Sequence, residues 1–186
     1  MSSKVASSYR TDVLSSGLNA GKAVKVRALL TAWRRAAQNE AALQWKLLYT
    51  EGQFNQYSKL KLTSKLNAAC SQMLRWQVVG QLKSWLSNRA LNFKDLVLGS
   101  SLDETTRHQL LTVNKLQAWF KPEALVMRDG TEISPEVRHL ARVLFRRLVH
   151  KNRAPRWRRI GMMLDQRAVQ HLPPKKACHF GLWLRM

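Results

Sequence analysis

The sequence predicts a mainly α-helical protein, a helical bundle with one or two short β-strands at the ends of the chain. Three observations support this prediction. Apolar residues recur at helical spacing through most of the 186 residues. Residues that favour helix starts precede several of these stretches, and alternation with a period of two is confined to the two ends. With 45% hydrophobic residues, the chain is apolar enough to bury a core.

The N-terminal part predicts one strand and then a long helix. Residues 6–14 alternate weakly and end at Ser15-Ser16-Gly17, a turn sequence. From Lys22 to about Tyr49 the spacing is helical, and one face carries Val26, Leu29, Leu30, Trp33, Ala36, Ala37, Ala41, Leu47 and Leu48. Glu40 falls on this face. We expect it to pair with an arginine of a neighbouring helix rather than to act in catalysis, because buried acids are normally paired.

A second long helix is expected after the break at Glu51-Gly52-Gln53. It begins at Leu60 or Lys65 and ends near Asn88, with Gly80 as a point of close packing. One side carries Leu66, Ala69, Cys70, Met73 and Leu74. Cys70 is therefore interpreted as a small core residue rather than as a reactive thiol.

Two further helix starts carry recognisable caps. Ser101-Leu102-Asp103-Glu104 reads as a capping box, and the helix behind it should run toward Trp119 and stop before Pro122. Ser134-Pro135-Glu136 starts another helix, which places the arginines Arg138, Arg142 and Arg146 in an i, i+4 row. Its docking side carries Val137, Leu140, Ala141, Leu144 and Leu148.

The chain should end in one more helix and a strand. Ala154-Pro155 stops the preceding helix, and a last helix is expected from Arg156 to about Gln170, with Trp157, Ile160, Leu164 and Ala168 buried. In the tail, Cys178, Phe180, Leu182 and Leu184 alternate with their neighbours, which is typical of a strand. The pattern stops abruptly at Met186, so we expect the sequence to be a piece of something longer, with another chain completing the sheet.

The charge predicts a polyanionic partner. With 32 Lys and Arg against 11 Asp and Glu, the net charge is +21 and the pI about 11.1, which favours nucleic acid. The densest cluster has no acidic residue between Glu136 and Asp165 and consists of Arg138, Arg142, Arg146, Arg147, Lys151, Arg153, Arg156, Arg158 and Arg159. A weaker candidate, for which a merely solvated helix face is an equal alternative, consists of Arg27, Arg34 and Arg35.

These residues suggest how a nucleic acid would be bound. Arg138, Arg142 and Arg146 would follow phosphates along one strand, with Arg147 and Lys151 at the margin. The arginines from Arg153 to Arg159 would clamp a bend or junction. Within them, Trp157 is either a core residue, as its spacing to Ile160 favours, or a platform on which a base stacks.

Nothing in the sequence predicts a catalytic site, a metal or a cofactor. Cys70 and Cys178 are too few and too far apart for a zinc ribbon or a disulfide framework. The five histidines lack a neighbouring nucleophile or ligand spacing, and the acids mostly stand at helix starts. No stretch is long and apolar enough to span a bilayer. We expect a cytoplasmic protein, associated with the nucleoid when bound to DNA, and no membrane partner.

The order of elements resembles the N-terminal half of TnpB-like transposon proteins, relatives of the type V CRISPR nucleases. The resemblance rests on LNAGKAVKVRALLTAWRRAA, VVGQLKSWLSNR, LARVLFRRLVHKNRAPRWRRIGMMLD and the strand HFGLWLR. It implies a wedge domain with an inserted helical recognition domain, which together hold a guide RNA and its DNA heteroduplex. The RuvC carboxylates and the zinc ribbon of that family would lie beyond this sequence.

The resemblance and the residue patterns together predict four segments. These are an N-terminal wedge strand (1–18), a helical recognition domain (19–130), a basic helical region (131–172) and a C-terminal strand (173–186). The expected function is binding of structured RNA or DNA without catalysis. One alternative is a self-contained DNA-binding or regulatory protein that places the region from Arg138 to Arg159 in a groove. The other is an enzyme whose site is completed by a second chain.

Overall fold

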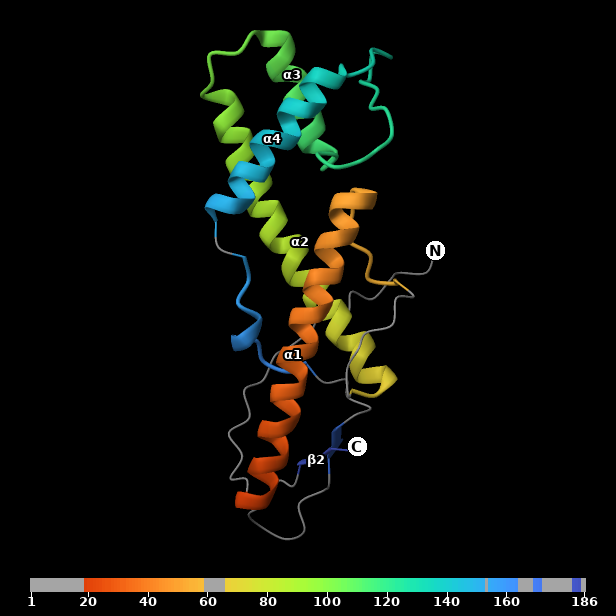
Figure 1. The fold of residues 1–186 in the computed structure, drawn as a ribbon, viewed down its shortest axis with the longest axis vertical. Helices are drawn as coiled ribbons and strands as arrows, with labels where there is room; N and C mark the ends of the chain where they lie inside the picture. Colours follow the sequence, from red (N-terminus) through yellow and green to blue (C-terminus); the bar gives the residue numbers. More distant parts are fainter. Residues whose placement is uncertain (1–18, 59–65, 153, 164–168, 172–181, 185–186) are drawn as a thin grey trace, which may run out of the picture.

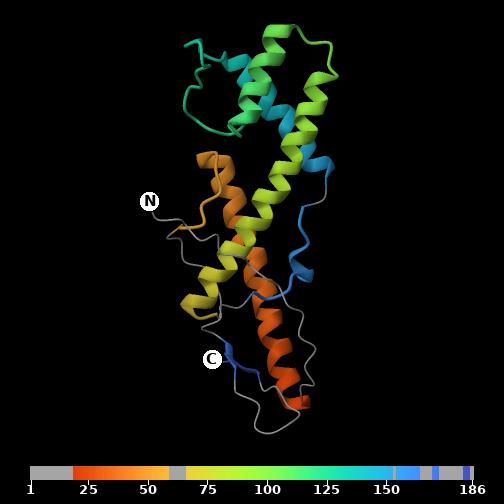
Figure 2. The same ribbon diagram turned by 180° about the vertical axis from the view of Figure 1, so that it is seen from behind.

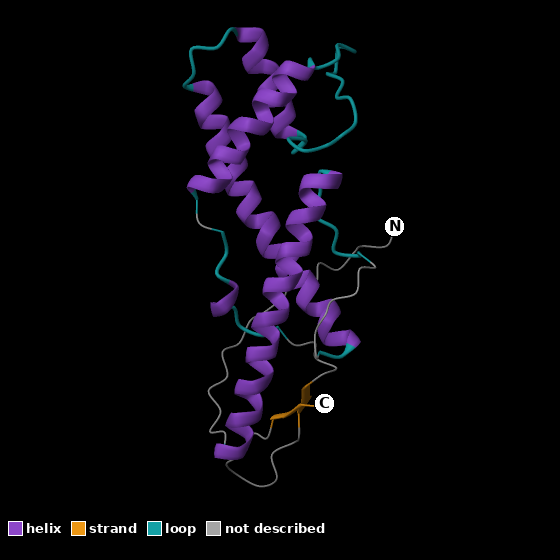
Figure 3. Ribbon diagram, in the orientation of Figure 1, coloured by secondary structure: helices purple, strands orange, loops and turns teal. Residues whose placement is uncertain are grey.

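The computed structural model describes residues 19–58, 66–152, 154–163, 169–171 and 182–184. This part of the chain is mainly α-helical, which confirms the predicted fold class (Figure 3). Its elements are α1 (Ala20–Glu51), α2 (Ala68–Leu98), α3 (Glu104–Lys115), α4 (Pro135–Lys151), the 3-10 turn η1 (Trp157–Arg159), β1 (Val169–His171) and β2 (Leu182–Leu184). The strand predicted over residues 6–14 lies outside the described residues.

The four helices form an elongated bundle built on two long helices that cross. α1 packs against α2, while α3 and α4 pack against the C-terminal half of α2 and against each other (Figures 1 and 2). After α4 the chain turns back, and η1 packs against α1. Segments far apart in the sequence, the first helix and residues 154–163, therefore lie side by side.

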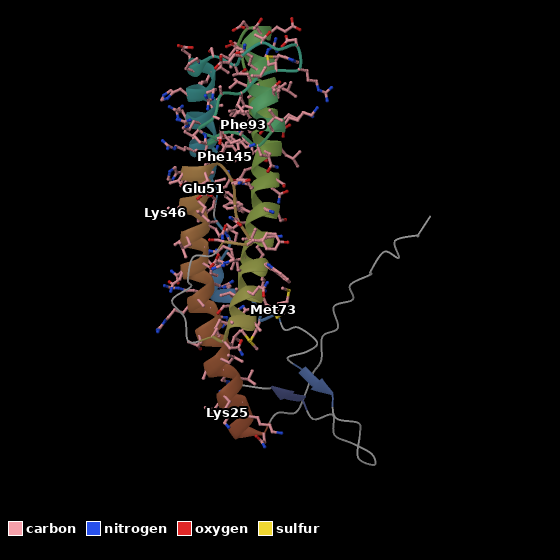
Figure 4. All side chains as sticks on the ribbon, turned by 90° about the vertical axis from the view of Figure 1, so that its right-hand side faces the viewer. Lys25, Lys46, Glu51, Met73, Phe93 and Phe145 are labelled. Carbon is pink, nitrogen blue, oxygen red and sulfur yellow. The ribbon has the colours of Figure 1, made fainter. Side chains whose placement is uncertain are left out.

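One continuous core connects these contacts. Between α1 and α2 it contains the small residues Ala36 and Ala37, which allow the helices to approach closely, around the buried Trp33. Farther along α2 it becomes aromatic. The rings of Trp119 and Phe145 stack with their centroids 3.8 Å apart, and Figure 4 shows Phe145 beside Phe93 of α2 at this end.

The helix ends follow local chemistry, and the sequence predicted the end of α1 at Gly52 and the start of α4 at Ser134. Asn19 Oδ1 accepts from the backbone N–H of Lys22 at 2.9 Å at the start of α1. Gly52 ends α1 with φ of 74°, and its N–H donates to Leu48 O. Ser134 caps α4 with Pro135 in the first turn, as predicted.

Glu40 has the partner expected for a buried acid. Its side chain is 1% exposed, and Oε1 accepts from Arg75 Nε of α2 at 3.0 Å. Gln44 Nε2 donates to the same oxygen at 2.8 Å and also to Asn55 O, so the pair is tied to the turn after α1. The prediction of a structural ion pair is confirmed.

The second helix differs from the prediction in its length and in the role of its glycine. α2 starts at Ala68, capped by Asn67, and continues beyond Asn88 to Leu98. The extension forms because Phe93 and Val97 are buried against the aromatic end of the core, and this burial outweighs the weak helix propensity of Asn88, Asn92 and Asp95. Gly80 is exposed, and a Cβ added there would meet no atom of a neighbouring element within 4 Å, so the expected close packing was wrong.

The third helix begins later and ends earlier than predicted. Asp103, not Ser101, is the cap, and its side chain accepts from Thr106 N at 2.8 Å. The helix ends at Lys115 because Gln117 adopts φ of 49°. The N–H groups of Gln117 and Ala118 then donate to Asn114 O and Val113 O, which closes the helix in a Schellman motif with glutamine in place of the usual glycine.

Over the residues that the structure describes, the helix predicted from Arg156 to about Gln170 does not form. Residues 157–159 make one 3-10 turn, residues 160–163 are not helical, and Gln170 belongs to β1. The carbonyls of Ile160 and Gly161 instead accept from Arg34 Nε and Gln77 Nε2, side chains of α1 and α2. These tertiary hydrogen bonds replace the helical ones.

The C-terminal strand is confirmed over the residues that the structure describes. β2 pairs antiparallel with β1, with Val169 opposite Leu184 and His171 opposite Leu182. The remainder of the predicted strand, and the predicted core residues Leu164 and Ala168, lie outside the described residues. Ile160 is buried as expected.

Candidate nucleic-acid interface

The spacing of the arginine row on α4 suggested side chains that are free to bind phosphate. Two members of the row, Arg138 and Arg142, are instead hydrogen-bonded within the fold. Arg138 Nη2 donates to Lys121 O at 2.8 Å and to Pro122 O at 3.2 Å, and Arg142 Nε donates to Trp119 O at 3.4 Å. Both side chains are half-buried. The accepting carbonyls belong to the turn after α3, where no helix supplies a donor for them, and the two arginines supply one instead. These hydrogen bonds hold the turn against α4.

Arg146, the third member of this row, covers aromatic rings. Its guanidinium carbon lies 5.7 Å from the ring centroid of Phe120 and 6.0 Å from that of Tyr49. Burial raises the pKa of Tyr49, and the charge of Arg146 partly opposes that rise. Arg146 is nevertheless exposed, and so are Arg147 and Lys151 farther along α4. Arg153 lies outside the described residues.

The structure joins two basic clusters that the sequence presented as separate. Arg34 Nε donates to Ile160 O at 3.2 Å and so fixes the segment after η1 on α1. Gln77 of α2 holds the next carbonyl, Gly161 O, at 2.9 Å and also accepts from Trp33 Nε1. The resulting surface, called here the arginine patch, consists of Arg34, Arg35, Arg156, Arg158 and Arg159.

Most side chains of the arginine patch are exposed and can therefore reach a ligand. Arg34 is half-buried, whereas Arg35, Arg156, Arg158 and Arg159 are exposed. None of the five forms an ion pair with a carboxylate among the described residues. Arg27 is also exposed on α1, seven residues before Arg34, which corresponds to about 10 Å along a helix axis. It extends the patch toward the start of α1.

Gln38 belongs to the same surface, although it was not among the predicted site residues. It follows Arg34 by four residues and Arg35 by three, so the three share one face of α1. Together with Arg156, Trp157, Arg158 and Arg159 it lines an open pocket of about 420 Å³. The sequence placed Gln38 on the polar face of the first helix with Arg34, but it did not show which segment would pack beside that face.

The acidic residues are segregated along the bundle. Within residues 20–50, 68–94 and 154–163, the acidic residue is Glu40, which is buried and paired with Arg75. The other described acids lie at the end of α1, at the end of α2 and around α3 and the start of α4; they are Glu51, Asp95, Asp103, Glu104, Glu123, Asp129, Glu132 and Glu136. In Figure 4, Lys25 lies at the cationic end of α1 and Glu51 at the other end. The field around the arginine patch is therefore positive over a wide area.

The described part of the chain holds no cluster of metal ligands and no membrane-spanning helix. No three His, Cys, Asp or Glu side chains there come together as metal ligands. None of the described helices combines the length and apolar composition needed to cross a bilayer. Cys70, interpreted as a core residue, is half-buried and packs against the core.

Comparison with known proteins gave no matching family model, no similar curated protein and no similar solved structure.

Proposed function

We propose that the protein binds nucleic acid through contacts between the arginine patch and the phosphate backbone. Arginine suits this role because its planar guanidinium pairs with a phosphate through two parallel N–H donors. The observation that carries the proposal is the union of Arg34 and Arg35 with Arg156, Arg158 and Arg159, two clusters more than 120 residues apart, in a region without an exposed described carboxylate.

The rest of the charge distribution supports this choice of surface. Arg147 and Lys151, exposed near the end of α4, precede the segment that descends to the arginine patch (Figure 1). Arg138 and Arg142 have already used N–H donors on backbone carbonyls, which favours a structural role for them. This weakens the alternative in which α4 acts as a recognition helix in a groove.

Structured RNA is the first ligand to test. The resemblance to TnpB-like proteins, which stays a prediction, implies a guide-type RNA, and folded RNA is recognised largely through its backbone and shape. The binding role requires no catalytic residue, in keeping with the expectation that the chain itself does not cleave nucleic acid. Duplex DNA of the same length serves as the comparison.

The test is a fluorescence-anisotropy titration of a labelled RNA hairpin over a series of salt concentrations. Each neutralised phosphate contributes about 0.7 to 0.9 to the slope of log affinity against log salt, so five contacts predict a slope of about −3.5 to −4.5. Arg158→Ala with Arg159→Ala should weaken binding by about ten-fold or more and make the slope shallower by about 1.4 to 1.8.

A matched control is available at the other end of the bundle. Lys115 and Arg128 are both exposed and lie in the part of the molecule that carries the carboxylates. Lys115→Ala with Arg128→Ala removes the same charge and should leave both affinity and slope nearly unchanged. If the two double variants weaken binding equally, the protein responds only to net charge, and the arginine patch is not the binding surface.

A further inference from the structure

Trp157 contacts both the hydrophobic core and an open pocket. It is half-buried and packs against the hydrophobic core, and it also lines the pocket of about 420 Å³. Among the described residues it stacks on no other aromatic ring, whereas Trp45 and Trp85 pack edge to face with each other and Trp119 stacks on Phe145. The pocket side of Trp157 is therefore not covered by another ring.

The polar groups around this ring are suited to a base and its phosphates. Arg156, Arg158 and Arg159 supply cationic donors, and Gln38 supplies an amide that both donates and accepts. A phosphate alone would use the arginines but has no flat face for the indole. The pocket volume lies within the range of about 300 to 1,000 Å³ typical of small-ligand sites.

We propose that this pocket holds one unpaired base of the bound nucleic acid, stacked on Trp157, while the flanking phosphates contact the arginine patch. The inference rests on the proposed function and narrows its ligand. A base inside a duplex is already stacked on its neighbours and cannot reach the indole. The preferred ligand is therefore a bulge, a loop or a strand end rather than a continuous helix.

Three RNA hairpins test this proposal. They share one stem sequence, and in each the loop is replaced by a non-nucleotide linker and the open end is blunt, so that only the bulge can offer an unpaired base. One is fully paired, one carries a single bulged nucleotide, and the third carries an abasic nucleotide in the bulge, which keeps the phosphate and removes the base. We expect the base-containing bulge to bind about ten-fold more tightly than the abasic one, as for one base stacked on an aromatic side chain. The fully paired hairpin should bind like the abasic one.

Variants of Trp157 locate the effect. Trp157→Phe keeps an aromatic face and should retain most of the preference, whereas Trp157→Leu keeps apolar volume against the core and should abolish it. Binding to the fully paired hairpin should be nearly the same for both. Thermal unfolding of each variant, followed by circular dichroism, checks that the helices are intact.

The outcomes separate this inference from the proposed function. Equal affinity of the wild-type protein for the base-containing and abasic bulges overturns the stacking proposal, even if all three hairpins bind with a steep salt dependence. The same holds if Trp157→Leu folds and keeps the preference. If none of the hairpins binds at low salt, both proposals fail. The wild-type comparison decides the question even if a variant does not fold.

Discussion

Arg75 of α2 and Glu40 of α1 form an ion pair whose Nε to Oε1 distance is 3.0 Å, inside the contact between the two long helices. The Glu40 side chain is 1% exposed and the Arg75 side chain 14% exposed. The guanidinium of Arg75 also donates to Ser58 O, which connects the pair to the turn that follows α1. One side-chain pair thus ties two helices and a loop together.

Removing one partner of this pair should cost far more than removing both. Arg75→Met leaves the carboxylate of Glu40 buried without its counter-charge, and we expect a loss of about 3 to 5 kcal/mol in the free energy of unfolding. The double variant Arg75→Met with Glu40→Leu should recover most of that loss. Urea denaturation of the two single variants, the double variant and the wild type measures the coupling, and additive effects would contradict it.

This pair was predictable from the sequence because it follows from one local fact. A carboxylate on an apolar helix face must be paired, whatever the partner's identity, and a basic chain offers many arginines. The end of α1 at Gly52 and the start of α4 at Ser134 were predictable for the same reason, since caps and left-handed glycines act within a few residues.

Features that depend on distant contacts were not predictable. The spacing of Arg138 and Arg142 showed a row but not that the turn after α3 would place its carbonyls beside it. The helical spacing of Trp157 and Ile160 suggested a helix, but Arg34 and Gln77 bind the carbonyls of this segment in an extended form. The arginine patch forms because this segment packs on α1. The sequence therefore predicted the residues of the patch as binding residues, but not that the two clusters would lie together.

Three glycines should respond differently to alanine. Gly52 has φ of 74°, and a Cβ there would lie 2.8 Å from Lys121 Cα and 2.9 Å from its N. Gly52→Ala should therefore lower the free energy of unfolding by about 2 kcal/mol or more, the sum of left-handed backbone strain and a backbone clash. Equilibrium denaturation in urea measures the loss.

Gly130 and Gly80 are the matched controls for that variant. Gly130 has φ of 85° but open space around it, so Gly130→Ala should cost only the backbone strain of about 1 kcal/mol. Gly80 is helical and has open space, so Gly80→Ala should stabilise α2 by about 0.5 to 1 kcal/mol. Equal effects at Gly52 and Gly130 would show that the close approach to Lys121 is not maintained in solution.

Acid should destabilise the end of the bundle that carries the carboxylates. The hydrogen bond from the Thr106 backbone amide lowers the pKa of Asp103, and that from Thr131 lowers the pKa of Asp129. A folded-state pKa below the unfolded value means that the stabilisation is present above the unfolded pKa, about 3.9, and is lost as the pH falls through the folded pKa. The urea midpoint should therefore decline below about pH 5.

Asp103→Asn isolates the contribution of one cap to this decline. Asparagine is an equally good N-cap but does not titrate in this range, so the variant should match the wild type near pH 7, where Asp103→Ala is less stable, and should lose less stability than the wild type as the pH falls. Both carboxylates are exposed, so each contribution is small. An Asp103→Asn variant whose midpoint falls with acid as steeply as the wild type would show that the cap bond is not what the pH affects.

Substituting Arg138 should lower the stability of the fold, whereas substituting Arg158 should lower the affinity for nucleic acid. Arg138→Ala removes the hydrogen bonds to Lys121 O and Pro122 O and should cost about 1 to 2 kcal/mol in the free energy of unfolding, with affinity for RNA changed by about two-fold at most. Arg158→Ala removes an exposed side chain and should change stability by no more than about 0.5 kcal/mol. It should weaken binding several-fold and make the salt slope shallower by about 0.7 to 0.9.

Urea denaturation and anisotropy titrations on the same two preparations make this comparison decisive, because each variant is the control for the other. The backbone carbonyls that Arg138 binds are part of the fold, so its loss should appear in unfolding whether or not RNA is present. Arg158 contacts no described carboxylate, so its loss should appear in binding. If Arg138→Ala weakens RNA binding more than Arg158→Ala at a temperature where both are folded, the phosphate surface is the row on α4 that the sequence first suggested.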